Sequence, residues 1–139
     1  MTGISGTEKS RGEGLSQIGQ IAINVKDTAR ATAFYRDKLG MKFLFSAGPM
    51  SFFDCEGVRI MLSPPGAPKF DHPASLIYFK VADIEAQYEA MQAAGVQFED
   101  KPHIVAPMPT YDLWMTHFND TEGNLLVLMS EVARIAAST

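Results

Sequence analysis

Few residues of this sequence have side chains suited to acid–base, nucleophilic or metal chemistry, and they are widely spaced. The three histidines, His72, His103 and His117, include no pair at the spacing that places two metal ligands on one face of a helix. The single cysteine, Cys55, lies between two acidic residues, whose charge disfavours a reactive thiolate. The sequence therefore identifies no catalytic residue. The candidates that it offers are His117, near the end of a predicted strand, and His103, which opens a proline-rich loop.

Two pairs of acidic residues occupy similar positions. Asp54 and Glu56 precede a glycine and an apolar run, and Asp120 and Glu122 precede another glycine and another apolar run. Paired carboxylates suit general acid–base catalysis, but residues that recur at matching turns more often hold the turn itself. We therefore expect both pairs to be structural.

These turns belong to a longer internal repeat. The pattern Val-x-Asp, ahead of apolar residues at helical spacing, begins at Val25 and again at Val81. Each copy reads as strand, helix, strands, turn and strand, and a repeat of this kind decides the fold. The sequence therefore predicts two βαβββ modules, residues 17–63 and 74–130, joined by a linker rich in proline.

One domain over residues 17–131 accounts for most of the 139 residues. Residues 1–16 are rich in glycine and lack the apolar segment of a secretory signal, so we expect a flexible tail there. Residues 132–139 are expected to form a C-terminal tail. A long loop over residues 102–109, which holds several prolines, is predicted only for the second module.

The composition limits the partners that this protein can have. Its 46% apolar and 20% charged residues are typical of a soluble globular protein. The net charge of −4 argues against nucleic acid, whose phosphates need a basic surface. No apolar run approaches the ~18 residues of a membrane span. A single cysteine permits no intrachain disulfide, which fits a cytoplasmic protein.

Two segments carry a resemblance to a known family. Residues 33–41 contain a Phe-Tyr and a Leu-Gly pair around the end of the first predicted helix, and residues 118–125 contain the Asp-x-Glu-Gly turn. With the βαβββ repeat, the chain resembles the vicinal oxygen chelate superfamily, which contains glyoxalase I, bleomycin-resistance proteins and extradiol dioxygenases. The resemblance implies an α+β fold whose modules form a curled, barrel-like mixed sheet around a cup. This fold hosts several chemistries and does not fix the function.

The resemblance also implies positions for metal ligands on four strands of the cup: Gln20, Met61, Leu76 and Val127. Enzymes of the family use His, Gln and Glu there, because hard divalent cations prefer nitrogen and oxygen donors. Leu76 and Val127 offer no donor, Met61 offers only a thioether, and Gln20 cannot hold a metal alone. We therefore expect no metal and no other cofactor. The alternative is a divalent metal at a site that the family does not use.

The same positions would face the cup, and the alternation of side chains along a strand adds further residues. The side chains expected to bind a ligand are Gln20, Asn24, Arg59, Met61, Leu76, Tyr78 and Val127, with Trp114 from the loop above. A mostly apolar lining suits an aromatic or aliphatic small molecule oriented by one or two hydrogen bonds. The alternative is that these side chains simply fill a closed interior.

Two functions are compatible with these residues. The first is a metal-free binding protein of the bleomycin-resistance type, which holds an apolar or aromatic ligand in the cup. The second is a lyase, isomerase or dioxygenase that uses a relocated metal, or His117 or His103 as acid or base. The missing ligand set favours the first, and whether the protein is an enzyme stays open. The expected partners are a small molecule and, because each module leaves sheet edges open, a second copy of the chain in a homodimer.

Overall fold

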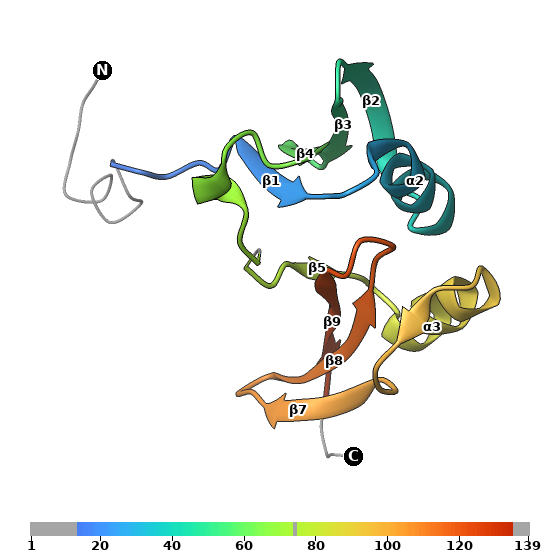
Figure 1. Ribbon diagram of the computed structural model, residues 1–139. Helices are drawn as coiled ribbons and strands as arrows, with labels where there is room; N and C mark the ends of the chain where they lie inside the picture. Colours follow the sequence, from blue (N-terminus) through green and yellow to red (C-terminus); the bar gives the residue numbers. More distant parts are fainter. Residues whose placement is uncertain (1–13, 74, 135–139) are drawn as a thin grey trace.

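The computed structural model describes residues 14–73 and 75–134. Most of the predicted N-terminal tail, residues 1–16, and the end of the predicted C-terminal tail lie outside the described residues. Within them the predicted α+β architecture of two modules is confirmed (Figure 1). The sheets are curled but do not close into a barrel.

The two modules follow the same order of elements, except that the second has one additional strand, β7. The first contains β1 (Gln20–Asn24), α2 (Thr28–Ala33) with its continuation η1 (Phe34–Lys38), β2 (Lys42–Ala47), β3 (Met50–Cys55) and β4 (Val58–Ser63). The linker contains one short helix, η2 (Pro68–Phe70). The second contains β5 (Tyr78–Lys80), α3 (Ile84–Ala93), β6 (Gln97–Phe98), β7 (His103–Pro107), β8 (Tyr111–Asn119) and β9 (Leu125–Ala133). In the described part of the chain, every helix is too short or too polar to span a bilayer.

Both sheets place the first strand of the module at an edge, beside the last strand. The strand orders are β1-β4-β3-β2 and β5-β9-β8-β6, and β7 also pairs with β8. β1 runs parallel to β4 and β5 runs parallel to β9, whereas the hairpin pairs are antiparallel. Both helices lie on one side of the sheets, and β1 and β5 are the edges nearest the other module (Figure 1). We call the opposite side the helix-free face.

Local sequence explains where the helices begin. Asp27 and Asp83 accept hydrogen bonds from the backbone N–H groups of Arg30 and Ala86, each at 3.0 Å. A carboxylate at this position satisfies a donor that the first turn of a helix leaves free. The aspartates that mark the repeat in the sequence are therefore the residues that start both helices.

The core fills the space between the sheets and the helices. Alternate residues of the central strands point toward it, and they meet aromatic residues from η1, β3 and β8. The buried side chains at the centre are Ile23, Tyr35, Phe53, Ile60, Phe118 and Leu126. Because these residues face the helices, their strand neighbours face the other way and form the helix-free face.

The predicted loop over residues 102–109 is wrong in part, because β7 occupies most of it. β7 pairs with β8 through His103↔Met115 and Ile104↔Trp114, and the register shifts after Ile104. Prolines are compatible with a strand at the edge of a sheet, where one side of the backbone has no partner strand. β9 also continues to Ala133, so the first residues of the predicted C-terminal tail belong to the sheet.

The turn between β8 and β9 locks the two modules together. The side chain of Glu122 has 0% exposure, and its Oε2 lies 2.8 Å from Arg30 Nε. Its Oε1 accepts hydrogen bonds from the backbone N–H groups of Lys26 and Asp27, at 2.7 and 2.9 Å. Burial disfavours the charged form of Glu122, but these donors outweigh it and lower its pKa to about 2. We call this arrangement the Glu122 clamp.

A second contact reinforces the Glu122 clamp. The buried Tyr35 hydroxyl donates a 2.7 Å hydrogen bond to Asp120 Oδ2. The other oxygen of Asp120 accepts from the backbone N–H groups of Glu122 and Asn124, both at 2.8 Å. Burial, and then the charge of Asp120, raise the pKa of Tyr35. The acidic pair of the second module therefore has the structural role that its sequence position indicates.

The turn of the first module differs from its sequence counterpart. Cys55 pairs directly with Val58, which leaves Glu56 and Gly57 as a tight turn with positive φ angles of 47° and 96°. In the second module the longer segment from Asp120 to Asn124 separates the two strands. Glu56 is exposed and has no ion pair among the described residues. The repeated Asp-x-Glu-Gly sequence therefore folds into two different turns.

The difference between the two turns predicts that a Glu→Gln substitution changes the free energy of unfolding much more at Glu122 than at Glu56. Glu122→Gln should lower the free energy of unfolding by roughly 1–3 kcal/mol, because buried donors lose a charged acceptor. Glu56→Gln should change it by less than about 0.5 kcal/mol, as at most exposed positions. Urea unfolding of both variants and the wild type at pH 7 checks this. Equal losses in the two variants would contradict the clamp.

The pH dependence supplies a control for the same pair of variants. In the folded protein the pKa of Glu122 is about 2, below its ordinary value of 4.5. The Glu122 carboxylate therefore stabilises the fold fully at pH values above 4.5, and this stabilisation is lost as the pH falls from 4.5 toward 2. The gap between the wild type and Glu122→Gln should therefore close between those two pH values. A gap that stays constant over that range would argue that the glutamine disturbs packing instead.

Candidate functional site

The helix-free face of the first sheet brings together three residues predicted to bind a ligand. Gln20 Oε1 accepts a 2.8 Å hydrogen bond from Arg59 Nε, and its Nε2 lies 3.8 Å from Met61 Sδ. The Arg59 guanidinium lies 5.5 Å from the centre of the Phe52 ring, which itself stacks on Phe45. Cross-strand pairing of Phe52 with Met61 makes this row continuous across two strands.

The linker folds over this face. The Asn24 side chain donates hydrogen bonds to the carbonyl oxygens of Phe70 and His72, at 2.6 and 3.2 Å. A cavity of about 500 Å³, which we call the linker cavity, lies between the linker and the sheet. Its lining residues are Ala22, Asn24, Met50, Met61, Ser63, Pro64, Pro65, Gly66, Phe70 and His72. The amide of Asn24 therefore holds the roof of the cavity, a role that the sequence did not indicate.

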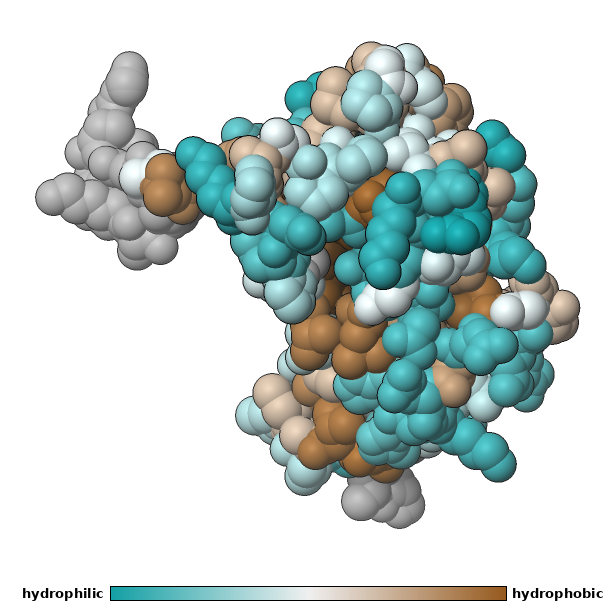
Figure 2. Space-filling view, in the orientation of Figure 1, coloured by the Kyte–Doolittle hydropathy of each residue, from teal (hydrophilic) through white to brown (hydrophobic). Residues whose placement is uncertain are grey.

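On the second sheet the predicted ligand-binding residues form another row. Tyr78 pairs with Val127, and Val127 pairs with His117 on the other side. Tyr78 is 45% exposed, whereas Val127 is completely buried. β5 is shorter than the sequence predicted, so Leu76 precedes it and is exposed. Figure 2 shows hydrophobic residues gathered beside the linker over the strands of this sheet.

Trp114 does not join this set. Trp114 and His117 lie three residues apart on β8, so their side chains point to opposite faces of the sheet. Trp114 therefore lies on the helix side, against the core and beside Ile84. From the sequence we expected Trp114 on a loop above the cup. In the structure it lies on β8, which pairs with β7, and neighbouring side chains along a strand point to opposite faces.

His117 has an acidic partner. Its Nδ1 lies 2.9 Å from Asp100 Oδ2, and its backbone N–H donates to Asp100 Oδ1 at 2.8 Å. Thr116 Oγ1 also donates to Asp100 Oδ1, at 2.9 Å. Burial opposes the charge of Asp100, but these hydrogen bonds outweigh it and lower the pKa of the carboxyl group. A histidine whose Nδ1 faces a fixed carboxylate keeps Nε2 for a ligand or a proton.

Sequence reasoning missed Asp100 because it lies outside any motif. The available signal was the antiparallel pairing of β6 with β8, which places the residues after β6 beside the middle of β8. The other candidate histidine, His103, lies on β7 opposite Met115 of β8. Its Nδ1 is 2.7 Å from the carbonyl oxygen of Lys101. His72 lies in the linker and lines the linker cavity.

The side chains at the four metal positions do not fit a hard divalent cation. The carbonyl oxygen of Gln20 is already bonded to Arg59, and the thioether of Met61 is a soft donor. Leu76 and Val127 are hydrocarbon. Among residues 14–73 and 75–134, no group of three or more His, Cys, Asp or Glu side chains is arranged to hold a metal ion. Chemistry through a metal at these positions therefore has no donor set to support it.

The thiol of Cys55 also gives no sign of reactivity. Burial raises its pKa, and the charges of Asp54 and Glu56 raise it further. The neutral thiol is a poor nucleophile. The expectation that Cys55 is not a nucleophile therefore has a physical basis in the structure as well as in the sequence.

Comparison with known proteins agrees with this fold. The model of the Glyoxalase/Bleomycin resistance protein/Dioxygenase superfamily matches residues 17–128. Uncharacterized protein YraH of Bacillus subtilis (strain 168) is 27% identical over 121 residues, which cover 77% of this chain and 92% of YraH. The resemblance seen in the sequence is thereby confirmed.

Solved structures with the same fold include proteins of different function. Lactoylglutathione lyase from Agrobacterium tumefaciens matches with a TM-score of 0.66 and 21% identity, over 83% of this chain and 93% of that one. TnmS3, an antibiotic binding protein from Streptomyces sp. CB03234, matches with a TM-score of 0.66 and 18% identity, over 84% and 97%. At these identities the likeness shows the fold alone.

The side chains at the four positions predict how the protein responds to metals. After dialysis against Mn²⁺, Fe²⁺, Ni²⁺ or Zn²⁺ and then against buffer, elemental analysis should find far less than one equivalent bound. One equivalent that disappears in Gln20→Ala would show that these positions do hold a metal. One equivalent that disappears in His117→Gln or His103→Gln would place a metal at the histidines instead.

Proposed function

Because this chain belongs to the Glyoxalase/Bleomycin resistance protein/Dioxygenase superfamily, we propose that it binds an apolar or aromatic small molecule in the linker cavity without a metal. The observation that carries this proposal is the cavity itself. Its volume of about 500 Å³ falls within the ordinary range for small-molecule sites. It also lies on the helix-free face, where the resemblance placed the ligand.

The lining of the linker cavity favours a flat or flexible apolar ligand. Met50 and Met61 have soft, unbranched side chains that adapt to irregular shapes, and Phe70 offers an aromatic surface. Ser63 and Asn24 supply the few polar atoms. TnmS3 is a precedent, on this fold, for a protein named for antibiotic binding. The lyase with the same fold shows that the fold does not choose between binding and catalysis; the lack of metal donors supports binding.

A thermal-shift screen of aromatic metabolites and antibiotics tests the proposal. A ligand that binds only the folded state adds about 2.7 kcal/mol of stability at a hundredfold excess over Kd, which should raise the melting temperature by several degrees. Met61→Trp should fill the cavity and abolish the shift. Met61 suits this test better than Val127, because Val127 is fully buried and a larger side chain there would overpack the sheet.

Val132→Trp is the matched control, because Val132 is an exposed residue of β9 outside the linker cavity. It should leave the shift unchanged. Hits that shift the wild type and Met61→Trp equally would place the ligand outside the linker cavity. Turnover of a hit by the wild type but not by His117→Gln would assign the acid–base function in place of simple binding.

The protein is also proposed to be a homodimer. The outer strands of both sheets carry exposed apolar side chains: Leu44 and Phe45 on β2 are 41% and 48% exposed, and Ile104 and Val105 on β7 are 50% and 42% exposed. Open sheet edges with apolar residues favour association. Sedimentation velocity at micromolar concentration should give the mass of two chains. A single species with the mass of one chain would overturn this proposal.

A further inference from the structure

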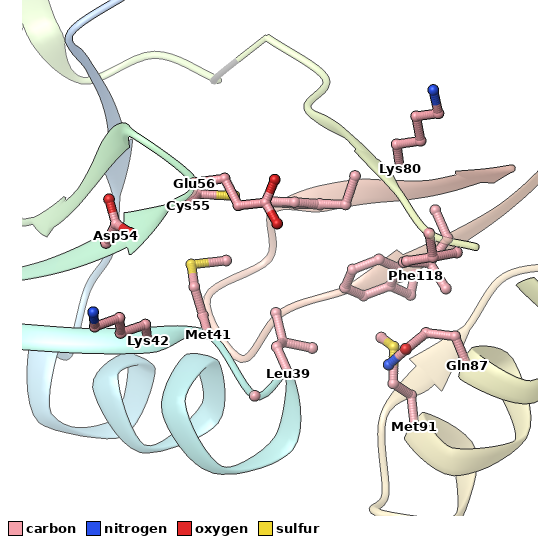
Figure 3. A pocket seen from close by; sticks show the side chains of 14 residues that line it. Leu39, Met41, Lys42, Asp54, Cys55, Glu56, Lys80, Gln87, Met91 and Phe118 are labelled. Carbon is pink, nitrogen blue, oxygen red and sulfur yellow. The ribbon is translucent and has the colours of Figure 1, made fainter. Parts of the chain in front are cut away.

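A second cavity, of about 390 Å³, lies between the two modules (Figure 3). We call it the junction cavity. Both modules contribute to its apolar floor, which consists of Leu39, Met41, Phe79, Met91, Phe118 and Leu128. The turn that contains Cys55 and Glu56 forms one side, and Gln87 of α3 lies on the other. None of its lining residues lines the linker cavity.

The internal repeat explains why this space is open. The turn of the second module meets the start of α2 in the Glu122 clamp, and the turn of the first module correspondingly faces α3 across the junction cavity. At the repeat spacing that takes Asp27 to Asp83, Arg30 corresponds to Ala86 and Tyr35 to Met91. The cation and the hydroxyl group that close one junction are thus absent from the other.

Among the described residues, the charges around the junction cavity leave the Glu56 carboxylate without an ion-pair partner. Lys80 forms an ion pair with Glu131 at 3.2 Å, and Lys42 lies opposite Asp54 in the β2–β3 ladder. In Figure 3 the amino groups of both lysines point away from the cavity. The Glu56 carboxylate extends over the floor, and it forms no ion pair or hydrogen bond with any residue that the structure describes.

From this arrangement we infer that the junction cavity binds a small organic cation with an apolar body, of the arylalkylamine class. The ammonium group pairs with Glu56, and the aromatic ring lies on the apolar floor. The ligand thereby supplies the positive charge that Arg30 supplies in the Glu122 clamp. This site is separate from the linker cavity, so it does not depend on the function proposed above.

Three ligands of similar shape and different charge test the inference: 2-phenylethylamine, 2-phenylethanol and 3-phenylpropanoate. Titration of the full chain at pH 7 should show the amine binding more tightly than the alcohol by about fivefold, the size expected for a partly exposed ion pair. The carboxylate should bind most weakly. Equal affinities for the three, or no saturable binding of any, would overturn the inference.

Two variants separate the ion pair from the apolar floor. Glu56→Gln should remove the preference for the amine over the alcohol while leaving the alcohol bound, because the floor is unchanged. Glu89→Gln, an exposed glutamate of α3 outside the cavity, is the matched control and should keep the preference. Loss of the preference in both variants would mean that net charge, and not Glu56, attracts the amine.

Methionine methyl groups report which cavity is occupied. Met41 and Met91 line the junction cavity, whereas Met50 and Met61 line the linker cavity. In a spectrum of methyl-labelled methionines, the amine should shift the signals of Met41 and Met91 and leave the other pair unchanged. Shifts confined to Met50 and Met61, or binding abolished by Met61→Trp, would assign the amine to the linker cavity and refute the junction site.

Discussion

The buried carboxylate of Glu122 fixes the relative position of the two modules. A carboxylate removed from water is stable only when hydrogen bonds and a positive charge replace its hydration. Here the replacements are Arg30 and the backbone N–H groups of Lys26 and Asp27. All of them belong to the first module, close to the N-terminus of α2, where the free N–H groups also favour negative charge. The orientation of the two helix-free faces, and of any site that they share, depends on this contact.

The two halves of the repeat share their main elements, apart from the additional strand β7, but they have unequal junctions. Both halves have the same order of their four main strands and an aspartate N-cap on their helix. The junctions differ because one turn is longer and because Arg30 has alanine as its counterpart. One junction is consequently filled by polar contacts, and the other is an apolar cavity with a charged rim. The divergence of the two copies therefore accounts for the open space of the junction cavity.

Short-range patterns in the sequence predicted most of the fold. The two modules, both helices and the row of Gln20, Arg59 and Met61 follow from local spacing and from the alternation of side chains along strands. The predictions failed where distant segments decide the outcome. β7 exists because β8 offers it a partner, and Asp100 meets His117 because β6 pairs with the same strand. Asn24, which was predicted to face a ligand, lines the linker cavity and also holds the linker through its amide, a contact that local sequence does not encode.

The side chains at the four positions where the resemblance places metal ligands determine what the helix-free face can recognise. A metal selects ligands by their donor atoms and fixes their geometry, whereas a surface of methionine, phenylalanine and proline selects by shape and apolar area. Two of the polar side chains there already make contacts within the protein: Gln20 with Arg59, and the Asn24 amide nitrogen with the linker. Affinity for the linker cavity should therefore depend on burial and respond little to salt, because apolar contacts are not screened. The junction cavity differs in this respect, since attraction to Glu56 weakens as ionic strength rises. Two cavities on one small domain would then discriminate ligands by different physical terms, one by shape and the other by charge.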